Sequence, residues 1–378
     1  MNQLIANKLN EEGAIILILE MQVGAEIGLD YNSWLVGKEF MGFKMVNPGF
    51  HCLFYSSVSK QNEFSIRTVL PLFVRSKEVC VFQWDSEEEQ LIDQNHLPED
   101  LVRKYQLSGA EFCYDSKTAG YPFDTIGKWM NMTNEIAPNL FSRLMDKSAI
   151  SFILDPASSP NYNYTETINI SQLIKQSELR SQMNIVTDSS PVSRLSQLYI
   201  DSSDELKKLC QLTNVVGEFQ FAFILFHIGQ DYESLLQWKN ILFLLTASYS
   251  MITSKNDISN VSLYQSAMKT LLLQLSELEE DFFTLTEGRD TEIQEGTKQP
   301  ARQLNRHNFV VKCLESFNQI LVEEPDEVDS EVKSTFERIK QVLKKRFNIV
   351  LESTYDGPLV MEETLLVCLP PNEDLFDI

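Results

Sequence analysis

The sequence predicts an α+β protein of two domains: an N-terminal domain of antiparallel strands, sandwich-like with a few helices, and a C-terminal all-α superhelical domain. The chain has 378 residues, more than one domain usually contains. Short apolar runs bounded by glycines and turn residues dominate the first part, whereas apolar residues recur at helical spacing from residue 204 onward. We therefore place a β-rich domain at 1–155, a polar linker at 156–203, a helical domain at 204–348 and an acidic tail at 349–378.

The strands of the first domain are expected at residues 14–19, 51–55, 68–74 and 79–84. The first of these is an isoleucine-rich run between Gly13 and Gly24, a pattern that is typical of a buried strand. The Asn-Pro-Gly sequence at 47–49 predicts a turn, because proline presets φ at the first central position and glycine accepts a positive φ at the second. We expect Lys77 and Glu78 to form the bend of a hairpin between the last two strands.

Two helices are expected to pack on this sheet. Residues 99–106 follow a proline and can form a short helix. Residues 124–136 place apolar side chains on one side at helical spacing, with Asp124 as the N-cap, and Pro138 ends or kinks the element.

The linker at 156–203 is rich in Ser, Asn, Gln and Thr. It cannot bury enough apolar surface to offset the entropy lost on ordering, so we expect it to be partly disordered. The loop at 287–305 is polar as well. Neither the linker nor this loop contains a pattern that indicates a catalytic or binding site.

The second domain contains about six predicted helices. They are expected at residues 204–212, 218–227, 232–250, 261–278, 309–321 and 332–343. The helix at 218–227 is apolar nearly all round and should be central and buried, with Gly229 ending it. Lys344, Lys345 and Arg346 suit the C-terminus of the last helix, because cations stabilise that end of the helix dipole. No repeat of fixed length is legible, so a regular solenoid is not expected.

The composition of the chain disfavours several classes of function. The net charge is −22, which disfavours direct nucleic-acid binding and adsorption to anionic membranes. The six cysteines and four histidines are dispersed without zinc-ligand or Cys-x-x-Cys spacing, so we expect no metal, no cofactor and a reducing compartment, cytosolic or nuclear. The first residues are polar and do not form a signal peptide, and the longest apolar stretch is too short to span a bilayer.

Candidate catalytic residues are few, and a structural role is favoured over a catalytic one for each. His51 and Cys52 are adjacent on a strand, so their side chains point to opposite faces and cannot form a dyad together. No second acidic motif supplies a partner for Asp30, and a turn-stabilising role is favoured. His227 lies in the apolar helix, where only Asp231 is found four residues away, so a core histidine is favoured over a ligand.

The tail carries the candidate binding segment. Residues 347–378 contain seven acids and no Lys or Arg. Within them lies a short apolar run that suits the addition of a strand to another protein's sheet edge. The candidate partner-binding residues are Leu365, Leu366, Val367, Cys368 and Leu369. The alternative, a final strand folded back onto its own domain, remains open.

Several strings closely resemble the Aar-two splicing-factor family. In the first half they are GLDYNSW at 28–34, VGKEFMGFKM at 36–45, PGFH at 48–51, YSS at 55–57, YP at 121–122, KW at 128–129 and TNEI at 133–136. In the second half they are GEFQFAF at 217–223, Gly229, Tyr232, WK at 238–239 and DFF at 281–283. The chain departs from the family pattern at Asn47, where the family has proline. The strings run through both predicted domains in order.

The resemblance implies an assembly factor of the U5 small nuclear ribonucleoprotein and not an enzyme. Such a protein binds the large scaffold protein of that particle in the cytoplasm and contacts the RNase-H-like and Jab/MPN-like domains of the scaffold. It prevents the RNA helicase of the particle from binding until nuclear maturation. The implied fold is a β-rich domain followed by a helical superhelix, and the implied role of the tail is strand addition to the scaffold. The protein alone is expected to be a monomer.

Two rival functions remain open at this point. A helical superhelix also suits an adaptor in vesicle or peptide sorting. A hydrolase using Asp30 or His51 is the third possibility.

Overall fold

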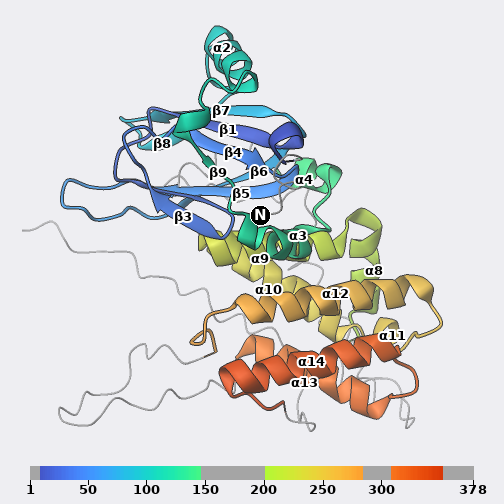
Figure 1. Cartoon of the computed structure of the whole chain (residues 1–378). Helices are drawn as coiled ribbons and strands as arrows, with labels where there is room; N and C mark the ends of the chain where they lie inside the picture. The colour runs from blue at the N-terminus through green and yellow to red at the C-terminus, as the bar shows by residue number, and fades with distance from the viewer. Residues whose placement is uncertain (1–8, 146–200, 284–307, 352–378) are drawn as a thin grey trace, which may run out of the picture.

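The computed structural model describes residues 9–145, 201–283 and 308–351. Two sheets with three helices form one end of the molecule, and the remaining helices stack beneath them (Figure 1). The predicted fold class, a β-rich N-terminal region followed by a helical region, is confirmed. The superhelical form stays a prediction.

The strands form two sheets. The five-stranded sheet has the order β8 (Gln90–Asp93), β7 (Val79–Asp85), β1 (Ala14–Leu19), β4 (Gly42–Val46) and β9 (Thr118–Gly120). The four-stranded sheet has the order β3 (Asn32–Leu35), β2 (Glu26–Leu29), β5 (Gly49–Ser56) and β6 (Thr68–Val74). The short strands β2, β3 and β4 were not predicted, because glycines and turn residues interrupt their apolar pattern.

Two expectations about strand pairing are corrected. The four-stranded sheet is antiparallel throughout, but β1 pairs with β7 in parallel and β4 pairs with β9 in parallel. Strands β6 and β7 do not form a hairpin, because the chain passes at Lys77 and Glu78 from one sheet to the other. An apolar run that is buried on both faces predicts where a strand lies in the sequence. It does not predict which strand pairs with it.

Strand β5 alternates between two cores. Leu53 and Tyr55 belong to the cluster enclosed between the sheets, whereas Phe50, Cys52 and Phe54 belong to the cluster that contains the helices. Successive side chains of a strand point to opposite faces, so one strand can contribute to both. The four-stranded sheet is therefore covered on one face by the other sheet and on the other face by helices.

The helices lie at the predicted positions with shifted ends, except that the helices at Pro138–Leu144 and Tyr249–Ile252 were not predicted as separate elements. Those of the first region are α2 (Glu99–Ala110), α3 (Ile126–Thr133) and α4 (Pro138–Leu144). Those of the second are α8 (Ser203–Leu212), α9 (Val215–Gly229), α10 (Tyr232–Ala247), α11 (Tyr249–Ile252), α12 (Ile258–Glu277), α13 (Phe309–Glu323) and α14 (Ser330–Phe347).

The chemistry at the helix ends explains these bounds. Asp124 does not cap α3; it lies in a 3-10 turn that precedes the helix. Pro138 begins a new helix, because a proline at the first helical position loses no intrahelical hydrogen bond. Helix α9 ends at Gly229, as predicted, and the next residue, Gln230, has a left-handed conformation. The side chain of Asn214 caps the start of α9, because it accepts a hydrogen bond from the backbone amide of Gly217.

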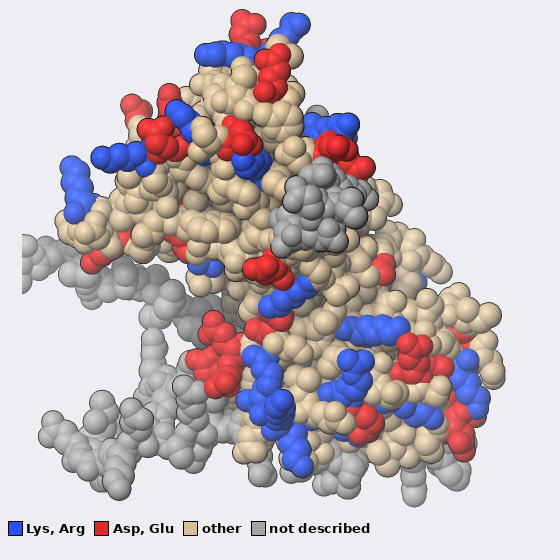
Figure 2. All heavy atoms as spheres, in the orientation of Figure 1, with Lys and Arg blue, Asp and Glu red and all other residues tan. Residues whose placement is uncertain are grey.

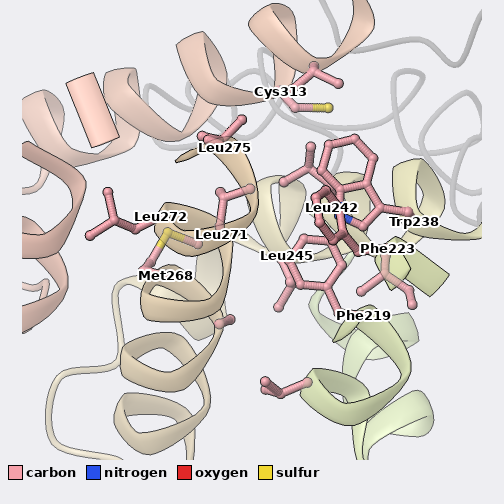
Figure 3. Packing of buried hydrophobic residues seen from close by; sticks show 14 of the residues in the cluster. Phe219, Phe223, Trp238, Leu242, Leu245, Met268, Leu271, Leu272, Leu275 and Cys313 are labelled. Carbon is pink, nitrogen blue, oxygen red and sulfur yellow. The ribbon is translucent and has the colours of Figure 1, made fainter. Parts of the chain in front are cut away.

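Helix α9 is buried along nearly its whole length, as its all-round apolar pattern predicted. The rings of Phe219 and Trp238 stack with centroids 5.8 Å apart (Figure 3). Trp238 Nε1 donates to Gln274 Oε1 at 2.8 Å, and the amide nitrogen of Gln274 donates to Phe219 O at 3.1 Å. Gln274 thus joins α9, α10 and α12 and leaves none of these buried polar groups unpaired.

Among the described helices, no single one is long and apolar enough to cross a membrane; α8 and α9 pass that test only as a pair bent by 87°. The predicted linker and the loop at 287–305 lie largely or wholly outside the described residues. The domain boundaries at 155 and 348 stay predictions.

The close approach of α9 to the first region generates a test. A Cβ at Gly217 would lie 2.4 Å from Glu135 O and from a methyl carbon of Leu140. We expect Gly217→Ala to lower the free energy of unfolding by about 1–3 kcal/mol, the usual cost of overpacking. Urea denaturation of the full chain measures it.

Gly127 in α3 provides the matched control, since a Cβ there meets no atom within 4 Å. Gly127→Ala should leave stability unchanged or raise it by up to ~1 kcal/mol. Equal destabilisation by both substitutions would contradict the close-packing argument.

Candidate functional site

The predicted partner-binding residues Leu365, Leu366, Val367, Cys368 and Leu369 lie outside the described residues, so that site stays a prediction. Within the described residues, the polar and aromatic side chains of the recognised strings converge where the sheet meets α9. This interdomain core positions an exposed edge of the sheet.

Asp30 is the polar centre of the first region. It occupies the turn between β2 and β3 with a φ of 57° and is 1% exposed. Its carboxylate accepts hydrogen bonds from the Cys52 amide at 2.8 Å, from His51 Nδ1 at 2.7 Å and from the Tyr121 hydroxyl at 2.5 Å. The expected local turn-stabilising role is therefore wrong, because the carboxylate bonds to residues 21 to 91 positions away.

His51 is held as an imidazolium. Its Nδ1 faces the Asp30 carboxylate, and its Nε2 lies 2.5 Å from the carbonyl oxygen of Asn47. The Asn47 carbonyl and the ionised Asp30 carboxylate both accept, so both ring nitrogens carry a proton when Asp30 is charged. Burial lowers the pKa of His51, but the charge of Asp30 and the hydrogen bonds to Asp30 and Asn47 raise it by more, and the net pKa is raised.

The Asp30–His51–Tyr121 network is sealed. His51 is 1% exposed, and its ring lies against the rings of Tyr121 and Trp129. Burial, then the Asp30 carboxylate, raises the pKa of the Tyr121 hydroxyl, so it stays a neutral donor. The two residues considered for a hydrolase do come together, but no substrate reaches them in this conformation. The network acts by fixing β2, β5 and the segment after β9 relative to one another.

Cys52 lies on the opposite face of β5 from His51, as the strand pattern predicted, and packs in the core shared with the helices. Burial raises the pKa of its thiol well above the usual range. His227 is half-buried and stacks on Phe223 with centroids 5.1 Å apart, and burial lowers its pKa. Among the residues that the structure describes, no group of three or more His, Cys, Asp or Glu side chains is placed to hold a metal ion.

Trp129 of α3 joins the two regions. Its Nε1 donates to Phe50 O at 2.7 Å, and its ring stacks on the Phe50 ring with centroids 5.9 Å apart. Phe50 in turn contacts Phe221 of α9 at a centroid distance of 5.6 Å. Since all three rings are buried in one apolar cluster with the helical domain, their contacts add to the area removed from water on folding.

Polar side chains of α9 complete this interface. Gln220 accepts from the Glu135 amide at 2.9 Å and donates to Asn134 Oδ1 at 2.7 Å, at the end of α3. Glu218, 5% exposed at the side chain, forms an ion pair with Arg143 of α4. Lys128 pairs with Glu277 of α12 and lies 4.3 Å above the Tyr31 ring. These directional contacts fix the relative placement of the two regions.

An exposed apolar surface lies at the edge of the four-stranded sheet. We call it the edge patch: Trp34 and Leu35 of β3 with Phe64 and Ile66 of the loop between β5 and β6, which are 37, 67, 53 and 80% exposed. They surround a pocket of about 450 Å³ that also contacts Arg67 and Gln230, the residue that ends α9. Among the described strands, β3 has a neighbour on one side only.

All four side chains of the edge patch are apolar or aromatic. Figure 2 shows acidic and basic side chains interspersed over the face that it draws. The charged pair of the pocket, Arg67 and Glu26, is self-neutralised at 3.2 Å. Exposed apolar side chains beside an unpaired strand edge are typical of a surface that binds another protein.

Sequence reasoning missed the Asp30–His51–Tyr121 network and the edge patch. The residues of each feature are not periodically spaced in the sequence, because only the tertiary fold brings them together. The available signal was that all three network residues lie within the recognised strings.

The imidazolium of His51 predicts a pH dependence. Histidines of the unfolded chain titrate near ~6.5, whereas folded His51 keeps its proton to a higher pH. Its stabilisation is therefore complete below ~6.5 and is lost as the pH rises through the raised pKa. We expect the free energy of unfolding to fall as the pH rises above ~6.5, and His51→Gln to remove that component.

His96, which is exposed on the surface, provides the control. His96→Gln should keep the wild-type slope of stability against pH, measured by urea denaturation at each pH. A wild-type slope in the His51→Gln variant would rule out the proposed protonation state.

Comparison with known proteins agrees with the strings. A family model described as the AAR2 N-terminal domain matches residues 12–146, and one described as the AAR2 C-terminal repeat region matches residues 178–352. The chain is 30% identical to Protein AAR2 homolog of Mus musculus over 315 residues, which cover 74% of this chain and 79% of the relative. The human homologue gives the same identity and coverage, and the Caenorhabditis elegans homologue is 26% identical over 76% of this chain and 85% of its own length. The resemblance is confirmed, and the chain belongs to the AAR2 family.

Proposed function

We propose that this protein is a pre-mRNA splicing factor: a non-catalytic assembly chaperone that binds the large scaffold protein of the U5 small nuclear ribonucleoprotein and blocks premature binding of other partners. Membership of the AAR2 family is the observation that carries the proposal. The scaffold's RNase-H-like and Jab/MPN-like domains are the proposed contacts. The protein acts as a monomer in the cytoplasm and the nucleus.

The physical basis of this function is shape and charge. The net charge of −22 favours a basic partner and disfavours direct contact with nucleic acid or anionic membranes. The interdomain core holds both regions in one arrangement, so binding costs little conformational entropy. No bond is made or broken, and the client is protected because part of its surface is covered.

Two segments supply the contacts with the client. Residues 365–369 add a strand to a sheet edge of the scaffold, with backbone hydrogen bonds giving affinity and alternate side chains giving specificity. The edge patch supplies a second, apolar contact, because Leu35 on the edge strand β3 and Ile66 in the loop before β6 are large and exposed. Two weak contacts on one chain bind together more tightly than either alone.

The edge patch can be tested with one matched pair of variants. Ile66→Glu removes an apolar side chain from the patch and should weaken binding to the purified scaffold by about tenfold, the effect of losing ~1.4 kcal/mol at one apolar contact. Isothermal titration calorimetry measures it. The control is Ile258→Glu, which changes an equally exposed isoleucine at the start of α12 and should leave affinity unchanged. Equal affinity of both variants and the wild type would exclude the edge patch.

The tail is tested by deletion of residues 359–378. Loss of the added strand should weaken the same complex by at least about tenfold, because several backbone hydrogen bonds are lost at the same time. Pull-down from cell extract provides the broader check. Unchanged affinity would reject strand addition, and recovery of vesicle proteins without any splicing scaffold would favour the sorting-adaptor alternative.

A further inference from the structure

An apolar groove runs along the other edge of the four-stranded sheet, away from the edge patch. Its volume is about 450 Å³, and its walls come from β6, β7 and α4. The apolar lining includes Leu72, Phe73, Cys80, Phe141 and Met145. Leu72 and Phe73 are half-buried, so the groove is open to a further apolar group.

Strand β6 limits what can bind there. Among the described strands it pairs only with β5, so its outer edge has no neighbour. Pro71 lies at the middle of β6 and has no N–H, and a continuous backbone ladder along this edge is therefore interrupted. Occupation of the groove must depend mainly on apolar side chains.

The path of the chain identifies the occupant. The described part of the first region ends at Met145, which itself lines the groove. The next residues, 146–155, read DKSAISFILD and contain the apolar residues Ile150, Phe152, Ile153 and Leu154. Five residues reach at most about 17 Å, so this run begins within reach of the groove. The chain is next described at residue 201, which leaves ample length for the passage to α8.

Charge agrees with this assignment. The lining includes two acids, Glu78 and Asp93, and no Lys or Arg. Lys147 is the one cation in residues 146–155 and precedes the apolar run, where it can meet these acids. The acidic tail contains no Lys or Arg and would bring no such complement.

We propose that residues 149–154 occupy the β6 groove and form part of the wall of the N-terminal domain. Their apolar side chains remove the groove lining from water, and the contact is intramolecular. The connection to the helical domain then starts only after residue 155.

Cys80 provides the readout, because it lines the groove and is 8% exposed. In the full-length chain, labelling by N-ethylmaleimide is followed at each cysteine by peptide mass spectrometry, with exposed Cys113 and buried Cys313 as internal references. Phe152→Asp should speed labelling of Cys80 roughly tenfold, the effect of ~1.4 kcal/mol of lost docking energy, and leave both references unchanged. The matched control, Tyr162→Asp, should change nothing.

A second variant covers the case in which Phe152→Asp unfolds the domain and Cys313 reacts as well. Phe152→Cys should form a disulfide with Cys80 on mild oxidation, whereas Tyr162→Cys should not. Unchanged Cys80 labelling in Phe152→Asp, or no disulfide in Phe152→Cys, would overturn the proposal. Faster labelling on deletion of residues 352–378, or slower labelling at higher protein concentration, would assign the groove to the tail or to a second copy instead.

Discussion

The packing of α9 against the outer face of β5 is the constraint on which the rest of the structure depends. Trp129 lies at its centre: its Nε1 satisfies the Phe50 carbonyl, and its ring lies between Phe50 and the His51–Asp30 pair. Without α9, the even-numbered side chains of β5 would face water. Without the sheet, α9 would expose part of an all-round apolar surface. Each region therefore completes the core of the other, and the surfaces at both sheet edges inherit their fixed positions from this contact.

A buried charged pair lies directly behind that contact. Removing Asp30 and His51 from water is costly, and the cost is offset because both carboxylate oxygens and both ring nitrogens are hydrogen-bonded. An apolar core can slide between alternative packings, whereas this network accepts one register of β2 against β5. We regard it as the device that fixes the geometry of the sheet on which Trp129 and α9 pack. This accounts for three reactive side chains in a place that no substrate reaches.

Much of the fold was predictable from the sequence, and the reasons differ by element. The helix predicted at 218–227, which is α9 in the structure, was expected to be central because nearly every residue is apolar, and β6 was predicted at its observed bounds from a continuous apolar run. Its partner could not be predicted, because a run that is buried on both faces fits a parallel or antiparallel neighbour equally well. The role of Asp30 was missed for a related reason, since its partners at positions 51, 52 and 121 are defined only by the tertiary structure. The edge patch was missed because isolated exposed apolar residues in loops carry no periodicity.

The central claim is that the two regions form one cooperative unit through the Trp129–Phe50–α9 interface. Differential scanning calorimetry of the full-length chain tests it most directly, because it compares the heat absorbed with the sharpness of the transition. The account predicts a single unfolding transition in which the calorimetric and van't Hoff enthalpies agree. Two resolved transitions, or a van't Hoff enthalpy well below the calorimetric value, would show that the sheet region and the helical region unfold independently and would contradict it.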